Sequence, residues 1–452
     1  MDSLNTLLNQ LSGIVWGPIT LILIVGCGVW LTIRLKFLQF RQLPFAFAQI
    51  FKKTPCGANG ATTEGDISQF AALMTALSAT IGTGNIAGVA TAVVLGGPGA
   101  VFWMWITAIF GMATKYAEAI LAVKYRVVNS KGQMSGGPMY YIERGLNMKW
   151  LAMIFAVLGT LASFGIGSSV QSNSVANAVA QSYGVGVWVT GVGLTIFTAF
   201  VLLGGIKSIA RASSVIVPVM ALIYVAGGLW IMAANYELII PAFQKIFTLA
   251  WGNEAVAGGL IGAIIRYGVA RGVFSNEAGM GSAPIAAAAA KTDHPARQAF
   301  VSMTGTFIDT IIVCTITGVV LVMGLEIFDR GNLTGAALTT FTFDGLLPGV
   351  GGDIVALGMI FFAYSTILGW SYYGEKCATY AFGDVVTWPY RVIYTASVLI
   401  GAVIHLDLVW AFADIFNGLM ALPNVIGLFL LTGVVVKETN DFFEKRRLGL
   451  LP

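Results

Sequence analysis

The sequence predicts an all-α protein that crosses a membrane many times. Three observations predict this class. The 452-residue chain is 57% hydrophobic and 10% charged, whereas soluble domains carry about 25% charged residues. Its mean hydropathy is +0.82. Apolar stretches of about 20 residues, the length of a helix that spans a bilayer, recur along the whole chain.

We predict eleven spans with no soluble domain between them. Residues 1–13 place four leucines on one helical face, which predicts a short helix on the membrane surface; an ordinary packed helix is the open alternative. The spans are expected at about 14–36, 68–92, 98–123, 150–181, 185–205, 213–234, 255–286, 297–325, 350–374, 388–405 and 408–436.

The basic residues predict how the spans are oriented. Twenty of the 25 lysines and arginines lie in one alternate set of loops and in the C-terminal tail, whereas the opposite set holds only Lys245 and Arg330. Loops rich in Lys and Arg stay in the cytoplasm. We therefore expect a multi-pass protein of the cell membrane with its N-terminus outside and its C-terminus in the cytoplasm. An extra or missing span would destroy this alternation.

Two spans are interrupted in the same way. The span that begins near residue 68 contains the sequence TIGTGN at 80–85, and the span that begins near 255 contains RGVFSNEAG at 271–279. A helix can break within a membrane only where protein or water surrounds it. Paired breaks of this kind mark the substrate site of secondary transporters.

The breaks divide the chain into two repeats. Residues 68–234 and 255–436 each hold five spans, of which the first is broken. An odd number of spans gives the two repeats opposite orientations, so we predict an inverted repeat, which resembles the leucine-transporter-like fold. The remaining residues are assigned to an N-terminal part, 1–67, with the surface helix, the extra span and a cytoplasmic loop, and to a cytoplasmic tail, 437–452.

The composition argues against other function classes. Four cysteines and two histidines show no metal-binding or disulfide spacing, and no nucleophile–base pair indicates an enzyme. No basic run is interleaved with aromatics, so nucleic acid is not expected as a partner. A channel needs a continuous polar pore, commonly built by several subunits. We expect a transporter that acts as a monomer in membrane lipid, without an organic cofactor.

Long motifs in the chain resemble one family. They are ATIGTGNIAGVATAVVLGGPG at 79–99, GGPGAVFWMW at 96–105, RGVFSNEAGMGSAPIAAAAAKTDHP at 271–295 and FAYSTILGWSYYGEKC at 362–377. They are similar to the signatures of the alanine or glycine:cation symporters, also called the sodium:alanine symporter family, within the amino acid–polyamine–organocation superfamily. The resemblance covers essentially the whole chain. It implies symport of alanine or glycine into the cell with sodium, by alternating access.

The same resemblance implies positions for sodium. GTGN at 82–85 resembles the GLGN element of leucine-transporter-like proteins, which implies that Asn85 lies near one sodium ion. Ser275 is implied as a cation ligand at the second break. A second sodium site is implied for the hydroxyls of Ser365 and Thr366 with the backbone carbonyls of Ser78 and Ile81. Thr80 departs from the pattern, in which a smaller residue is usual, so we expect one coupled sodium.

The substrate is expected between the breaks. Free N–H groups at a helix end suit a carboxylate, and Gly82 and Gly84 let the backbone approach it without a side chain, although such glycines also serve close helix packing. The resemblance implies that the backbone of residues 80–84, with Thr80 and Thr83, surrounds the carboxylate. The other predicted contacts are the rings of Phe274 and Trp370, which leave room for a methyl group, the amides of Gln171 and Asn276, and the close approach of a helix at Gly165.

Ionisable residues within spans are expensive and commonly functional. We expect Lys115 and Glu118 to pair on one helix, and Arg271 and Glu277 to brace the second break or gate access to it. Three roles remain open for Asp309: a ligand of the cation, the partner of an arginine, or a protonated acid. Proton-coupled symport of small amino acids, with Asp309 or Glu277 as the carrier, is therefore the alternative function.

Overall fold

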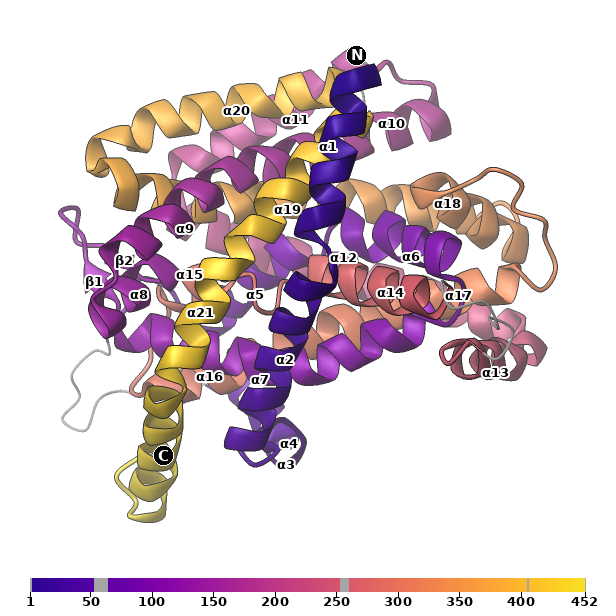
Figure 1. Ribbon diagram of the computed structural model, residues 1–452. Coiled ribbons are helices and arrows are strands. Elements are labelled where there is room, and N and C mark those ends of the chain that lie inside the picture. The colour runs from indigo at the N-terminus through magenta and orange to yellow at the C-terminus, as the bar shows by residue number, and fades with distance from the viewer. Residues whose placement is uncertain (1, 53–63, 253–259, 405, 452) are drawn as a thin grey trace.

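The computed structural model describes residues 2–52, 64–252, 260–404 and 406–451, and these form a bundle of helices (Figure 1). In the described ranges, strands are confined to β1 (Val127–Val128) and β2 (Met134–Ser135), which pair antiparallel. Residues 255–259 and 405, at the ends of two predicted spans, lie outside the described residues.

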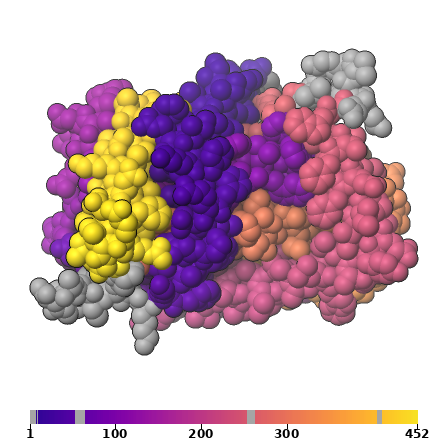
Figure 2. Space-filling model, turned by 90° about the horizontal axis from the view of Figure 1, so that it is seen from below, coloured from indigo at the N-terminus to yellow at the C-terminus, as the bar shows by residue number. Residues whose placement is uncertain are grey.

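The N-terminal helices pack against the C-terminal helix. α1 (Asp2–Val15) and α2 (Pro18–Arg34) follow one another along α21 (Leu406–Arg447), and Figures 1 and 2 show the indigo and yellow segments side by side. The indole Nε1 of Trp16 donates to the carbonyl of Asp414 at 2.9 Å, and Gly418 leaves room for Val15. α1 is thus packed on α21, because small residues of α21 admit it, and its place on a membrane surface stays a prediction.

The two predicted repeats contain these elements. After α3 (Leu38–Arg41) and α4 (Leu43–Ile50), the first repeat comprises α5 (Gln69–Thr80), the π-helical η1 (Gly84–Gly88), α6 (Val89–Gly96), α7 (Ala100–Lys124), α8 (Pro138–Leu146), α9 (Lys149–Ala162), the π-helical η2 (Ser163–Ser169), α10 (Val170–Tyr183), α11 (Val187–Leu203) and α12 (Gly205–Ala234). The connection to the second repeat holds η3 (Tyr236–Leu238) and α13 (Ile239–Leu249).

The second repeat follows the same order. It comprises α14 (Leu260–Asn276), α15 (Pro284–Ala287), α16 (Pro295–Thr306), the π-helical η4 (Phe307–Cys314), α17 (Thr315–Gly324), α18 (Gly335–Leu346), α19 (Gly351–Phe382), η5 (Asp384–Val386), α20 (Thr387–Val403) and α21. Helices at equivalent positions of the repeats pack on each other: α7 on α16, α10 on α19, and α11 on α20. Such pairing follows when two similar units face each other in opposite orientations.

Each predicted span coincides with a helix or with a broken helix. Within the described residues, seven helices are long and apolar enough to cross a bilayer, and the bent pair 69–80 and 84–96 adds an eighth if it counts as one span. α11, α14 and α20 have 17 residues each. The eleven-span count therefore stays a prediction. The start of α1 and the end of α21 lie at opposite ends of the molecule, as an odd count requires (Figure 1).

The two broken spans are joined at one end of the bundle, near β1 and β2. The backbone N–H of Asp66 donates to the carbonyl of Ala289 at 2.8 Å, and that of Lys291 donates to the carbonyl of Ile67 at 2.7 Å. The guanidinium of Arg126 donates to the carbonyls of Ala288 and Ala290 at 3.0 and 2.7 Å. These bonds close this end of the bundle with main-chain contacts.

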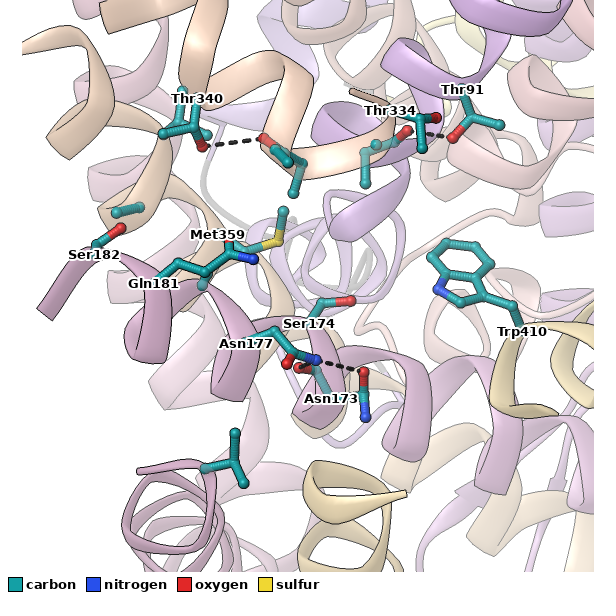
Figure 3. Close-up of a pocket in the computed structure, with 18 of the residues that line it drawn as sticks. Thr91, Asn173, Ser174, Asn177, Gln181, Ser182, Thr334, Thr340, Met359 and Trp410 are labelled. Atoms are coloured by element: carbon teal, nitrogen blue, oxygen red, sulfur yellow. Dashed lines mark hydrogen bonds between the residues drawn. The ribbon is translucent and has the colours of Figure 1, made fainter. Parts of the chain in front are cut away.

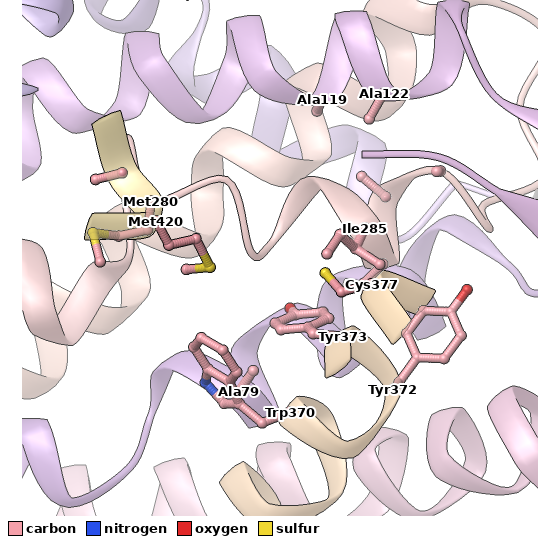
Figure 4. Packing of buried hydrophobic residues seen from close by; sticks show 14 of the residues in the cluster. Ala79, Ala119, Ala122, Met280, Ile285, Trp370, Tyr372, Tyr373, Cys377 and Met420 are labelled. Carbon is pink, nitrogen blue, oxygen red and sulfur yellow. The ribbon is translucent and has the colours of Figure 1, made fainter. Parts of the chain in front are cut away.

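The core next to the second break combines aromatic and sulfur-containing side chains. Met280 and Met420 lie near Trp370, which neighbours Ala79, while Tyr373 and Cys377 continue along α19 toward Ile285 (Figure 4). All of these side chains are buried. Rings and thioethers fill the irregular space that an interrupted helix leaves.

Candidate functional site

The first break separates α5 from η1. α5 ends at Thr80, Ile81 is extended, and the helix axes on either side differ by 53°. The N–H of Gly82 donates to Oδ1 of Asn85 at 2.9 Å, and the N–H of Thr83 donates to Oε1 of Gln171 at 3.3 Å. Two N–H groups freed by the break are thus bound by neutral amide oxygens.

Four oxygens meet where α5 ends against α19, and we call them the hydroxyl cluster: the carbonyls of Ser78 and Ile81 and the hydroxyls of Ser365 and Thr366. Oγ of Ser365 lies 3.3 Å from O of Ser78, and Oγ1 of Thr366 lies 3.3 Å from O of Ile81. All four residues are buried. These are the four residues predicted for one sodium site, and hard oxygens of this kind suit an alkali cation.

Both hydroxyls of the cluster also bond back to their own helix, as Ser and Thr in membrane helices commonly do. The carbonyl of Phe362 accepts from Oγ of Ser365 at 2.8 Å and from Oγ1 of Thr366 at 3.0 Å. A Cβ on Gly82 would lie 2.5 Å from Oγ1 of Thr366. Only a residue without a side chain lets α19 approach the break this closely.

Asp309 lies in a second group, which we call the Asp309 cluster: Asn85, Ser275, Asp309 and Thr310. Nδ2 of Asn85 donates to Oδ1 of Asp309 at 2.8 Å, while Oγ of Ser275 and Oγ1 of Thr310 donate to Oδ2 at 2.9 and 2.8 Å. All four are buried. Of the three roles left open for Asp309, the structure places it beside the two predicted cation ligands, and no described ion pair joins it to an arginine.

The second break begins after Asn276. Glu277, Gly279 and Gly281 have φ values of 56°, 89° and 81°, which turn the chain toward α15. Asn276, predicted to orient the substrate, accepts from the N–H of Ala278 at 2.9 Å and donates to Oγ1 of Thr310 at 3.2 Å. Oε1 of Glu277 accepts from Nε1 of Trp370 at 2.8 Å. Both side chains therefore brace the break.

Glu118 of α7 also binds the second break, and it does not form the expected pair with Lys115. Its Oε1 accepts from the N–H groups of Gly279 and Gly281 at 3.1 and 3.2 Å, and from Nδ2 of Asn424 at 2.7 Å. Among the described residues no ion pair joins Lys115 to Glu118. The carboxylate turns to the break because unpaired N–H groups are expensive to bury.

Phe274 lies between the first break and Trp410, which lines a cavity of about 730 Å³. Its ring stacks on Trp410 with centroids 5.6 Å apart, and a Cβ on Gly84 would lie 3.3 Å from it. Trp410 and Arg271 line the cavity, and the guanidinium of Arg271 lies 5.5 Å from the centroid of Phe274 and 3.6 Å from Asp414. Figure 3 shows Asn173, Asn177 and Gln181 of α10 on one wall, with Thr340 of α18, Thr334 directly before α18 and Thr91 of α6 opposite.

The remaining predicted residues are placed as follows. The hydroxyl of Thr80 bonds back to the carbonyls of Ala76 and Leu77, whereas the buried hydroxyl of Thr83 has no partner among the described residues. Gly165 faces Ala413 of α21 instead of the breaks; its neighbour Gly167 faces Trp370. Both glycines lie in the π-helical η2, whose altered period changes the direction of each residue.

The whole chain matches a known family. The family model described as "Sodium:alanine symporter family" matches residues 1–452. The chain belongs to the sodium:alanine symporter family. This member is 58% identical, over 98% of each chain, to the sodium/alanine symporter AgcS of Methanococcus maripaludis. It is also 38% identical to a putative sodium/proton-dependent alanine carrier protein of Bacillus subtilis, over 98% of this chain and 93% of the relative.

A solved structure supports the fold. MhsT in complex with L-phenylalanine superposes with a TM-score of 0.57 and 13% sequence identity, over 82% of this chain and 98% of that one. At this identity the likeness concerns the fold alone. The predicted leucine-transporter-like fold is confirmed, and this family member is a multi-pass membrane transporter of the symporter class.

Proposed function

We propose that the protein carries alanine and glycine into the cell together with sodium, by alternating access. The observation that supports this most strongly is the hydroxyl cluster, in which Ser365 and Thr366 of the second repeat meet the carbonyl oxygens of Ser78 and Ile81 at the first break. Sodium bound there bridges α5 and α19. The N-terminus lies outside and the tail, 437–452, lies in the cytoplasm.

The substrate carboxylate binds at the first break. Oε1 of Gln171 accepts from the N–H of Thr83 at 3.3 Å, a long bond to a neutral oxygen. A carboxylate is the better acceptor because charge-assisted hydrogen bonds are shorter and about twice as strong. The hydroxyl of Thr83 is buried without a described partner and offers a further donor. The rings of Phe274 and Trp370 then limit the side chain to about a methyl group.

The two ends of the bundle support alternating access. The end with β1 and β2 is closed by main-chain bonds between 66–67 and 289–291, while the cavity of about 730 Å³ lies on the other side of Phe274. By the distribution of Lys and Arg, the cavity lies on the outer side. We infer an outward-facing form in which Phe274 and Trp410 close the substrate site.

Proton coupling is the second candidate, and Asp309 is the observation that favours it. A buried carboxylate in contact with Asn85 and Ser275 can take up either a proton or sodium. The hydroxyl cluster has no group that binds a proton at physiological pH. The two candidates therefore assign the coupling ion to different clusters.

Uptake of radiolabelled alanine into proteoliposomes tests both, with sodium and proton gradients imposed separately. We expect a sodium gradient alone to drive alanine and glycine uptake, also when an ionophore collapses the proton gradient. Uptake driven by an acid exterior without sodium would replace the proposal by proton coupling. Leucine should not compete, because the two rings exclude it.

A further inference from the structure

Glu118 provides a carboxylate at the second break. It lies on α7, is fully buried, and its Oε1 accepts three hydrogen bonds from two other segments. Two donors are the main-chain N–H groups of Gly279 and Gly281. The third is the amide of Asn424 on α21, which also donates to the carbonyl of Gly279 at 2.8 Å and is itself held by the hydroxyl of Tyr141.

This set of donors suits one oxygen of a carboxylate, Oε1, while Oε2 is buried without a hydrogen-bond partner among the described residues. Main-chain N–H groups at the end of an interrupted helix bind anions through their hydrogen bonds and the local dipole. At the first break, the equivalent N–H groups are bound by amide oxygens of Asn85 and Gln171, which a ligand can displace. At the second break, an ionisable side chain of the protein itself already occupies them.

We propose that Glu118 is a positioning residue that occupies, within the protein, the carboxylate site of the second break. Because this site is filled, the amino acid substrate places its carboxylate only at the first break and binds in one orientation. The bonds of Glu118 also fix the turn that carries Glu277, which in turn holds the indole of Trp370. The single orientation of the substrate rests on the proposed function. The carboxylate site at the second break can be tested without transport.

Removing the side chain should create a site for a small carboxylate. Glu118→Ala deletes one methylene group and the carboxylate, and acetate has the same number of heavy atoms. Without the carboxylate, the N–H groups of Gly279 and Gly281 are left buried and unpaired, which lowers thermal stability and alanine affinity, the latter by about tenfold or more. Acetate should fill the vacated space and restore both.

The decisive measurement is the melting temperature of purified protein against acetate concentration, without alanine and sodium. We expect acetate to stabilise Glu118→Ala in a saturable way and to leave the wild type unchanged. Glu143→Ala is the matched control, because Glu143 accepts from the hydroxyl of Tyr380 and touches neither break. Benzoate should have no effect, because it is too large for the vacated space.

If acetate raises the melting temperature of Glu118→Ala no more than that of the wild type, the proposal is overturned. If Glu118→Ala cannot be purified, conservative variants decide the matter. Glu118→Gln should be less destabilising in the background of Asn424→Ala than in the wild type, because the two side chains share one network. Additive effects would overturn the proposal equally. Failure of sodium-driven alanine uptake would refute the proposed function and leave these stability results intact.

Discussion

The hydroxyl cluster and the Asp309 cluster lie on either side of the first break and differ in charge. The first brings together carbonyl and hydroxyl oxygens of Ser78, Ile81, Ser365 and Thr366. In the second, a carboxylate accepts from Asn85 and two hydroxyls. Asn85 joins the second cluster to the break, because its Oδ1 also accepts from the N–H of Gly82.

In the proposed coupling site, this difference separates the choice of the ion from the strength with which it is bound. Neutral oxygens select a metal cation over a proton, since none of them is basic. A buried carboxylate attracts any cation strongly but does not by itself distinguish sodium from a proton. The hydroxyl cluster should therefore determine which ion is used, and the Asp309 cluster how tightly the site as a whole holds positive charge.

Asp309→Asn should have the largest effect. An asparagine is neutral and keeps one acceptor oxygen, so Asn85, Ser275 and Thr310 all lose their charged partner, and at least one of them then faces an NH2 group. A loss of about 3 kcal/mol corresponds to about 100-fold weaker sodium-driven uptake in proteoliposomes. Asp344→Asn is the control, because Asp344 is exposed and accepts from the N–H groups of Gly349 and of Gly352 at the start of α19. Normal sodium-driven uptake by Asp309→Asn would remove this cluster from the coupling site.

Gly82→Ala should damage the hydroxyl cluster and leave the Asp309 cluster in place. The added Cβ would lie 2.5 Å from Oγ1 of Thr366 and 3.2 Å from Oε1 of Gln171. Overpacking of about 1–3 kcal/mol predicts a loss of about tenfold or more in alanine affinity, measured by equilibrium binding. Gly26→Ala is the control, since its Cβ would have no neighbour within 4 Å. Equal affinity of the two variants would argue against a substrate carboxylate at this break.

Thr366→Ala tests the hydroxyl cluster by removing one oxygen. We expect the sodium concentration for half-maximal uptake to rise about tenfold, the equivalent of about 1.4 kcal/mol. The maximal rate at saturating sodium should change little. Thr379→Ala, on the same helix, removes a hydroxyl that bonds back to the carbonyl of Lys376 and should behave as the wild type. An unchanged sodium requirement in Thr366→Ala would place the ion elsewhere.

The smallest effect is expected away from both clusters, at Asp441 in the tail. Hydrogen bonds from Lys445 and His294 lower the pKa of its carboxyl group. A lowered pKa in the folded state stabilises the protein above the unfolded value of about 3.9, and the contribution disappears as the pH falls through the folded value. Asp441→Asn should therefore lower thermal stability at neutral pH by less than about 1 kcal/mol. The difference in thermal stability between Asp441→Asn and the wild type should shrink toward pH 3. Both proteins should need the same sodium concentration for half-maximal uptake.

The family resemblance implied the four residues of the hydroxyl cluster and, of the Asp309 cluster, Asn85 and Ser275. Ser365 and Thr366 lie on an uninterrupted helix, α19, in which side chains keep the ordinary helical period. Asp309 lies in the π-helical η4, where an extra residue per turn rotates every following side chain. Its three possible roles could not be separated from the sequence, because the direction of the carboxylate depends on that local period.

The errors have similar physical origins. Gly165 was assigned to the substrate site but faces α21, because it too lies in a π-helical segment, η2. Lys115 and Glu118 were expected to pair from their spacing on one helix. Glu118 instead accepts hydrogen bonds from the N–H groups of Gly279 and Gly281. That competition between a charged neighbour and a distant turn has no signal in local sequence.

α21 carries contacts at three levels of the molecule. It holds Trp410 beside the cavity, Asn424 at the second break and Asp441 near His294, over 42 residues or about 63 Å. Pro423 lies within this helix, directly before the residue that binds Glu118. A proline inside a helix removes one hydrogen bond and creates a point of bending. In the proposed alternating-access cycle, we therefore expect α21 to bend at Pro423, so that the part with Trp410 moves while Asn424 stays docked at the second break.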